Sequence, residues 1–215
     1  MRPHELFFVR PSSWTTVLAD GGMAVADPLV AQWADRGWPL IGRRRVPGEG
    51  EGVPLGLPLP PSADKRRLSF LLPHGAIHAT LSPPLLRVAG RVAPRRWWGT
   101  IDRLGALALQ HGLEAQVFGS LMWRALTGLS YVTDESDLDL LLQVHPHTDL
   151  LALVEEIAAI ERLAPMRIDG ELVREDGVAE NWRELLGGAR DVLVKSDAGV
   201  DLLDTRRFLS AEVRP

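Results

Sequence analysis

Cysteine is absent from the 215-residue sequence. This absence excludes disulfide scaffolds, zinc–thiolate sites, iron–sulfur clusters and cysteine nucleophiles. Long apolar runs are also missing, since no stretch approaches the ~18–20 residues that a membrane-spanning helix needs. The N-terminus, Met1 to Leu6, has neither the apolar stretch nor the small-residue cleavage site of a secretory signal. We therefore expect a cytoplasmic protein with no membrane contact.

Positive charge is in short supply as well. The chain has 24 Lys and Arg against 28 Asp and Glu, which gives a formal net charge of −4. Such a balance provides no sequence-wide attraction to phosphates, which argues against a protein that coats nucleic acid. Hydrophobic residues make up 46% and charged residues 24% of the sequence, as in a globular protein of one large or two small domains.

Proline and glycine divide the first half of the chain into short segments. Asp27 and Pro28 predict the start of a helix, with Asp27 as its N-cap, and Gly37 predicts its end. Residues 46–61 hold five Pro and four Gly, which is typical of a loop with at most short extended pieces. Short strands are expected at residues 39–45, 66–72 and 76–81. We place a domain boundary near residue 90, so that residues 1–90 form a smaller α+β domain.

The second half is periodic and predicts alternating helices and strands. Ile101, Leu104, Leu107 and Ala108 lie on one face of a helix over residues 98–111. Further helices are expected at 121–126, at 148–163 with Thr148 as N-cap, and at 179–186; strands are expected at 115–118, 137–144, 166–173, 191–195 and 200–203. This order predicts the α/β (α+β) class, with helices packed on a mixed sheet in residues 91–215.

Two carboxylates begin an otherwise apolar predicted strand, at Asp137 and Asp139. The period of two in a strand places both on one face, with Cα atoms about 6.5–7 Å apart. Like charges at this spacing repel each other, and a divalent cation between them relieves the repulsion. Hard carboxylate oxygens suit Mg²⁺. An Asp-x-Asp sequence at the start of a strand is also common in solvated turns, so the pair alone does not decide between the two interpretations.

Gly119 and Ser120 follow a short predicted strand and precede a helix. Glycine allows the backbone to approach a ligand closely, and the free N–H groups of a helix start attract anions. A phosphate-binding turn opposite a metal-binding carboxylate pair is typical of enzymes that transfer phosphoryl or nucleotidyl groups. Asp169 on the next predicted strand is a third candidate ligand, although Asp169-Gly170 also fits a hairpin turn. Lys195 is either a triphosphate ligand or a charge that protects a sheet edge.

Four tryptophans are candidates for structural anchors or for binding platforms. Trp97, Trp98, Trp123 and Trp182 are each more typical of core or domain-interface anchors than of surfaces on which bases stack. We therefore expect them to be structural.

Gly119-Ser120 followed by Asp137-Leu138-Asp139 resembles the signature of the nucleotidyltransferase superfamily, which has the polymerase-beta-like fold. Longer strings, residues 117–131, 136–142 and 167–171, resemble the holo-acyl-carrier-protein synthases of malonate decarboxylase, the phosphoribosyl-dephospho-CoA transferase family. The resemblance also reaches Trp38-Pro39-Leu40, residues 56–60 and residues 192–195, so it covers nearly the whole chain. The gap between Gly-Ser and Asp-x-Asp is longer here than in the superfamily's general pattern.

The resemblance implies transfer of a phosphoribosyl-dephospho-CoA group from its 5''-triphosphate precursor to a serine of the acyl-carrier subunit, with release of pyrophosphate. It further implies Mg²⁺ on Asp137, Asp139 and Asp169, and phosphate at Gly119 and Ser120. Residues 1–90 would then recognise the substrate or the carrier, and residues 91–215 would be catalytic. Two alternatives stay open: an ATP-dependent nucleotidyltransferase that adenylylates a small molecule or protein, and an inactive module that binds a carrier or nucleotide.

Overall fold

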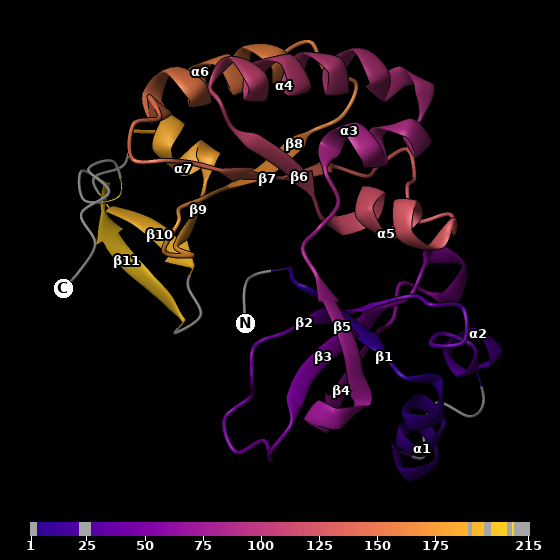
Figure 1. Cartoon of the computed structure of the whole chain (residues 1–215). Coiled ribbons are helices and arrows are strands. Elements are labelled where there is room, and N and C mark those ends of the chain that lie inside the picture. The colour runs from indigo at the N-terminus through magenta and orange to yellow at the C-terminus, as the bar shows by residue number, and fades with distance from the viewer. Residues whose placement is uncertain (1–3, 22–26, 189–190, 196–198, 206–207, 209–215) are drawn as a thin grey trace. The chain divides into compact units, whose positions relative to one another are not determined.

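The computed structural model describes residues 4–21, 27–188, 191–195, 199–205 and 208. The chain forms two compact units (Figure 1). The first comprises Met1–Pro83 with Leu126–Ser130, and the second comprises Pro84–Ala125 with Tyr131–Pro215. Residue 90, the position of the predicted boundary, lies inside the second unit, seven residues after Pro83.

The first unit is built on an antiparallel sheet of five strands in the order β4-β3-β2-β1-β5. Its strands are β1 (Leu6–Val9), β2 (Leu40–Gly42), β3 (Val53–Pro58), β4 (Arg67–Leu72) and β5 (Ile77–Leu81). The helical segments are α1 (Pro11–Gly21), α2 (Pro28–Ala31), η1 (Pro61–Ala63) and η2 (His74–Ala76). This mixture of strands and helices is the α+β character that the sequence predicts for the N-terminal region.

Local signals in this unit are mostly confirmed. Asp27 is the N-cap of α2, since its Oδ1 accepts a hydrogen bond of 3.0 Å from the Leu29 N–H. The helix is only four residues long, and the chain then turns until Gly37, whose φ is 67°. Within the predicted loop at 46–61, the short extended piece that the prediction allows is strand β3, which runs between β2 and β4. Val53, Leu55 and Leu57 alternate and are buried, and this apolar alternation outweighs Pro54 between them.

The second unit holds a mixed sheet of six strands in the order β11-β10-β9-β8-β7-β6. The pair β7–β8 is parallel, whereas the other neighbours are antiparallel. Its strands are β6 (Glu114–Val117), β7 (Leu138–Gln143), β8 (Ile168–Val173), β9 (Ala179–Asn181), β10 (Asp191–Lys195) and β11 (Val200–Asp204). The helices are α3 (Leu86–Ala89), η3 (Gly90–Val92), η4 (Arg95–Trp97), α4 (Trp98–Gln110), α5 (Gly119–Thr127), α6 (Leu150–Glu161) and α7 (Trp182–Leu186).

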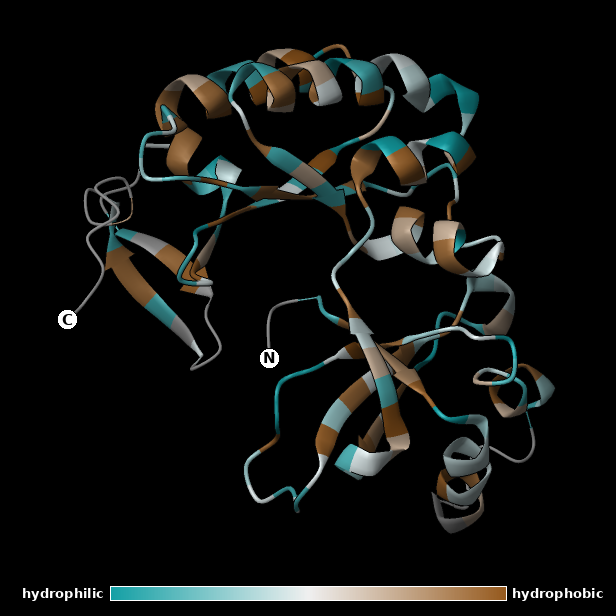
Figure 2. Ribbon diagram, in the orientation of Figure 1, coloured by the Kyte–Doolittle hydropathy of each residue, from teal (hydrophilic) through white to brown (hydrophobic). Residues whose placement is uncertain are grey.

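Helices α4, α6 and α7 cover one face of this sheet (Figure 1). The colouring in Figure 2 alternates between hydrophobic and hydrophilic along α4 and α6, as expected for helices with one buried side. On β7 the buried side chains of Leu138, Leu140 and Leu142 alternate with Asp139 and Leu141. The period of two therefore places Asp139 on the opposite face from these three leucines. Every helix in the described part of the chain is too short or too polar to cross a bilayer.

Two local predictions in this unit are wrong. The N-cap of α6 is Asp149, whose Oδ1 accepts a hydrogen bond of 3.0 Å from the Ala152 N–H. The hydroxyl of Thr148 instead accepts from the His145 N–H at 3.0 Å, so it closes the preceding turn. The predicted helix at 179–186 begins as strand β9, because residues 179–181 pair with β8, and only residues 182–186 form α7.

Glu180 is a buried carboxyl on β9, only 1% exposed, and neither of its side-chain oxygens has a hydrogen-bond partner among the described residues. Burial, together with the nearby charge of Glu184, raises its pKa to about 8. Because the ordinary value is 4.5, the folded state binds more protons than the unfolded state between about pH 4.5 and 8. The free energy of unfolding therefore falls as the pH rises through this window.

We expect Glu180→Gln to remove that pH-dependent cost. The variant should be about as stable as the unchanged protein at pH 4.5 and more stable, by on the order of 1–3 kcal/mol, at pH 8.5. Urea unfolding at both pH values measures the difference. Equal stability of the two proteins at pH 8.5 would contradict the assignment of a buried, protonated carboxyl.

Candidate active site

Asp139 and Asp169 lie directly opposite each other on neighbouring strands. The parallel register of β7 and β8 pairs Asp139 with Asp169 and Leu138 with Ile168. Paired residues on adjacent strands share a face, and the strands are about 4.8 Å apart. Asp169 is therefore inside β8, so the hairpin-turn interpretation of Asp169-Gly170 is wrong. Asp137 directly precedes β7.

Gly119 gives Asp139 its position. The chain leaves β6 through Phe118, whose N–H donates to the Asp139 carbonyl at 3.1 Å, and then turns at Gly119 with a φ of 58°. A Cβ atom on Gly119 would overlap Asp139 Oδ2 and lie 2.6 Å from its Cγ. The carboxylate thus packs against the bare Cα, where it accepts a hydrogen bond from the Ser120 N–H. Only glycine satisfies both the left-handed backbone and this contact.

The hydroxyl of Ser120 completes the turn. Its Oγ is buried and has no hydrogen-bond partner among the described residues. Buried hydroxyls are nearly always satisfied, so an unpartnered one next to a helix start indicates a place for a ligand. The hydroxyl and the turn at the start of α5 are therefore suited to an anion such as a phosphate.

Negative charge is concentrated at this site. Burial raises the pKa of Asp139 to about 7, and the neighbouring charges of Asp169, Asp137 and Glu171 raise it further, against the lowering effect of the Ser120 N–H. The ordinary value is 3.8. A carboxylate perturbed in this way, beside a second one, is typical of a functional site rather than of a solvated turn.

Asp169 is held by a residue that the sequence does not reveal. The side-chain Nδ2 of Asn181 donates to Asp169 Oδ1 at 2.8 Å, while its Oδ1 accepts from the Arg183 N–H at 3.0 Å and caps α7. Glu171 pairs in register with Asn181 and shares the face of Asp169. The alternation Asp169-Gly170-Glu171 was a usable signal for Glu171, whereas Asn181 lay within a predicted helix and gave none.

We expect Asn181 to orient Asp169 in addition to capping α7. Asn181→Ser keeps an uncharged oxygen for the cap but loses the long amide donor to Asp169, so activity should fall about tenfold or more with little loss of thermal stability. Asn181→Ala removes both functions and should also lower the free energy of unfolding by about 1 kcal/mol. Transfer rates and thermal denaturation of the two variants separate the roles. Full activity of Asn181→Ser would show that Asn181 acts only as the cap of α7.

The predicted Mg²⁺ site depends on how the carboxylates of β7 and β8 are arranged. Among the described residues, no group of three or more His, Asp or Glu side chains is arranged to hold a metal ion. The register does place two carboxylates side by side, Asp139 and Asp169, and the charge of Asp137 reaches Asp139. Mg²⁺ prefers hard oxygen ligands, and a bound cation would relieve the repulsion between the carboxylates. The residue types at this site therefore fit a Mg²⁺ ion.

The remaining predicted residue is only partly described. The backbone of Lys195 ends β10 and pairs with Ala179 of β9, whereas its side chain lies outside the described residues.

The loop between α5 and β7 carries its own contacts: Tyr131 stacks on Trp123 with ring centroids 6.0 Å apart, and Asp134 forms an ion pair of 2.6 Å with Arg96.

Comparison with known proteins gives consistent matches over most of the chain. Residues 2–83 match the family model described as phosphoribosyl-dephospho-CoA transferase MdcG N-terminal domain, and residues 84–206 match the model of the C-terminal domain. A phosphoribosyl-dephospho-CoA transferase of Bradyrhizobium diazoefficiens is 50% identical over 207 residues, 96% of this chain and 92% of that protein. Proteins of the same name from Xanthomonas campestris and Pseudomonas putida are 36% and 32% identical, over 93% and 94% of this chain and 92% and 93% of theirs. No solved structure gives a significant match.

Proposed function

We propose the following reaction for this chain, which belongs to the phosphoribosyl-dephospho-CoA transferase (MdcG) family. It transfers the phosphoribosyl-dephospho-CoA group from 2'-(5''-triphosphoribosyl)-3'-dephospho-CoA to a serine of the acyl-carrier subunit of malonate decarboxylase. The serine oxygen forms a bond to the α-phosphorus, the bond from that phosphorus to pyrophosphate breaks, and the hydroxyl proton is released.

One observation in the structure carries the proposal: Gly119 seats the Asp139 carboxylate beside the Ser120 N–H, in register with Asp169. A turn suited to a phosphate and an acidic pair are thus neighbours, which supports transfer between a triphosphate and a hydroxyl. The same arrangement supports the finer fold assignment that we propose, a nucleotidyltransferase (polymerase-beta-like) sheet within the observed mixed α/β unit.

Each residue has a separate task in this reaction. Asp137, Asp139 and Asp169 would hold Mg²⁺, which supplies positive charge to the triphosphate when bound. Ser120 donates from its hydroxyl to the phosphates at the start of α5, and Lys195 is proposed to add a cation there. Asp169, fixed by Asn181, orients the incoming serine hydroxyl. The task of Glu171 is electrostatic, because its charge raises the pKa of Asp139.

Two alternatives differ in donor or in chemistry. An ATP-dependent nucleotidyltransferase would use the same acidic pair with another triphosphate. An inactive binding module would have no need for carboxylates that repel one another and that raise the pKa of Asp139. This repulsion favours an active site that binds a cation.

Transfer onto the purified carrier subunit tests the proposal. We would incubate both proteins with triphosphoribosyl-dephospho-CoA, ATP or CTP, with and without Mg²⁺, and follow the intact mass of the carrier. A Mg²⁺-dependent gain of one phosphoribosyl-dephospho-CoA unit from the first donor alone is the expected result. A gain with ATP would indicate adenylylation, and no gain with any donor would favour the binding module.

A further inference from the structure

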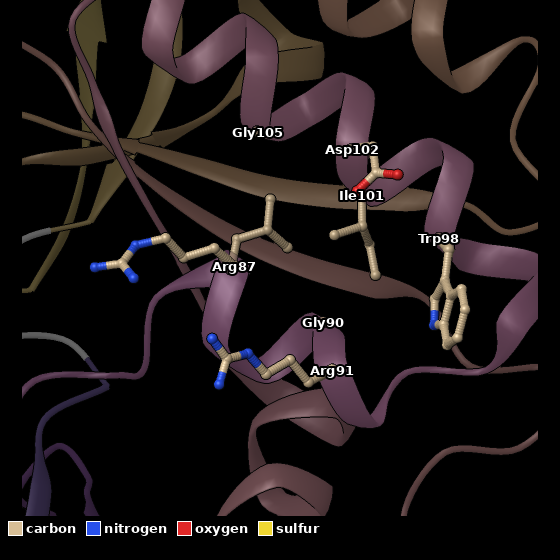
Figure 3. A pocket seen from close by; sticks show the side chains of 8 residues that line it. Arg87, Gly90, Arg91, Trp98, Ile101, Asp102 and Gly105 are labelled. Carbon is tan, nitrogen blue, oxygen red and sulfur yellow. The ribbon is translucent and has the colours of Figure 1, made fainter.

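A groove on the second unit, outside the acidic site, has the composition of a nucleotide site. It has a volume of about 550 Å³ and lies between the segment α3–η3 and helix α4. Figure 3 shows Arg87 and Arg91 on the first side, and Trp98, Ile101 and Asp102 on the second. Pockets for small molecules are commonly of about 300–1,000 Å³, with a mostly apolar lining and a few polar groups.

The two arginines form a pair that is available to an anion. Arg87 lies on α3 and Arg91 on the 3-10 turn η3 that directly follows it, and both line the groove. Both side chains are exposed. Among the described residues, neither guanidinium forms a hydrogen bond or an ion pair. Two adjacent guanidinium groups can each bind one phosphate of a diphosphate in a bidentate manner.

Trp98 offers an aromatic surface beside this pair, contrary to its expected role as a structural anchor. It is 46% exposed, although its neighbour Trp97 is fully buried. The Arg95 guanidinium lies over one face of the ring, 5.9 Å from its centroid, so a base would stack on the other face. Its indole N–H donates to the Ala93 carbonyl at 3.1 Å, which fixes the orientation of the ring. Stacking of a base on such a ring is worth about 1–3 kcal/mol. Asp102, one turn further along α4, is an acceptor suited to the amino group of adenine.

The groove is connected to the acidic site through a few hydrogen-bonded residues. The Val117 N–H donates to the Pro84 carbonyl at 2.9 Å, and Leu85 forms a β-bridge with Gln116. β6 in turn pairs with β7, which carries Asp139. Two strand spacings, about 10 Å in all, therefore separate Leu85, which leads into α3, from Leu141, which is two residues from Asp139 on β7. In the proposed donor, a single ribose connects the reacting 5''-phosphate to the adenosine.

We propose that this groove binds the adenosine diphosphate portion of the dephospho-CoA group, with the diphosphate on Arg87 and Arg91 and the adenine on Trp98. The assignment rests on the proposed function, because that function supplies the ligand. The groove would hold the non-reacting end of the donor while the triphosphate occupies the site at Gly119 and Asp139.

Calorimetry with 3'-dephospho-CoA, which has no triphosphate and cannot react, tests the groove directly. We expect the double variant Arg87→Ala/Arg91→Ala and the single variant Trp98→Ala each to bind this probe about tenfold more weakly or worse. Arg103→Ala is the matched control, since Arg103 is also exposed on α4 but does not line the groove. Its affinity should equal that of the unchanged protein. All the altered side chains are exposed, and thermal denaturation will verify that each variant is folded.

Transfer kinetics separate this inference from the proposed function. The groove variants should raise KM for triphosphoribosyl-dephospho-CoA and leave kcat and the KM for the carrier unchanged. Absent binding of the probe, or unchanged affinity in the groove variants, overturns the inference even if transfer occurs. A rise in the carrier's KM alone also overturns it, since the groove would then be a carrier-docking surface. If no donor supports transfer, the proposed function fails, and the calorimetry still decides whether the groove binds the nucleotide.

Discussion

Replacing Asp139 with Asn will abolish transfer and, at the same time, stabilise the protein at pH 8. Asp139 is the residue on which the turn and the second carboxylate converge: the Ser120 N–H donates to it, and Asp169 lies beside it. The Asn side chain keeps the size and one acceptor oxygen but loses the charge with which Asp139 would bind the proposed cation. We expect kcat to fall about a thousandfold or more.

The gain in stability follows from the direction of the pKa shift. Burial and the neighbouring carboxylates raise the pKa of Asp139 from 3.8 to about 7. The folded protein therefore binds more protons than the unfolded protein between these values, and its free energy of unfolding falls as the pH rises. Asn carries no such charge. With a chelator present, the variant should be more stable than the unchanged protein by roughly 1–3 kcal/mol at pH 8, and by less at pH 5.

Asp134→Asn is the matched control for this prediction. Asp134 lies in the loop before β7; its side chain is 90% exposed and forms an ion pair with the exposed Arg96. The same chemical change there should leave the transfer rate intact and alter stability by less than about 1 kcal/mol. Two results would refute the assignment of Asp139 as a functional carboxylate with a raised pKa: an Asp139→Asn variant that is less stable than the unchanged protein at pH 8, or one that transfers the group at the normal rate.

Features encoded within a few residues of each other were predictable from the sequence. The strand predicted over residues 137–144 is confirmed as β7, and its period of two places Asp139 on the face opposite Leu138, Leu140 and Leu142. The prediction that Asp169 lies on a neighbouring strand is confirmed by the register of β8. In the N-terminal unit, the cap at Asp27 is a contact between residues two apart, and it too was recognised.

Features that depend on distant pairing were not predictable. Strand β1 is stabilised by partners at Ile41 and Leu81, far along the chain, and the sequence analysis did not detect it. Asn181 reaches Asp169 only because β9 pairs with β8; taken alone, its surroundings favour a helix. The exposure of Trp98 next to the buried Trp97 likewise depends on which side of α4 meets the rest of the unit. Spacing along the sequence carries no information on such contacts.

The second large effect is expected for Gly119→Ala, which we predict to be nearly inactive while still folded. The added methyl group would lie 2.6 Å from Asp139 Cγ and 3.2 Å from its Cβ, so the whole carboxylate must rotate away. Its hydrogen bond from the Ser120 N–H and its alignment with Asp169 would be lost together. Misplacement of a reacting group by about 1 Å costs roughly a hundredfold in rate, and we expect at least that loss in kcat.

Gly112→Ala separates this contact from the backbone effect. Gly112 has a φ of 67°, close to the 58° of Gly119, but an added Cβ would meet nothing within 4 Å. Both substitutions pay the cost of a left-handed alanine, about 1–2 kcal/mol, and should lower thermal stability similarly. Only Gly119→Ala displaces Asp139, so only it should lose transfer activity. Equal activity of the two variants would mean that the Asp139 carboxylate takes no part in the reaction.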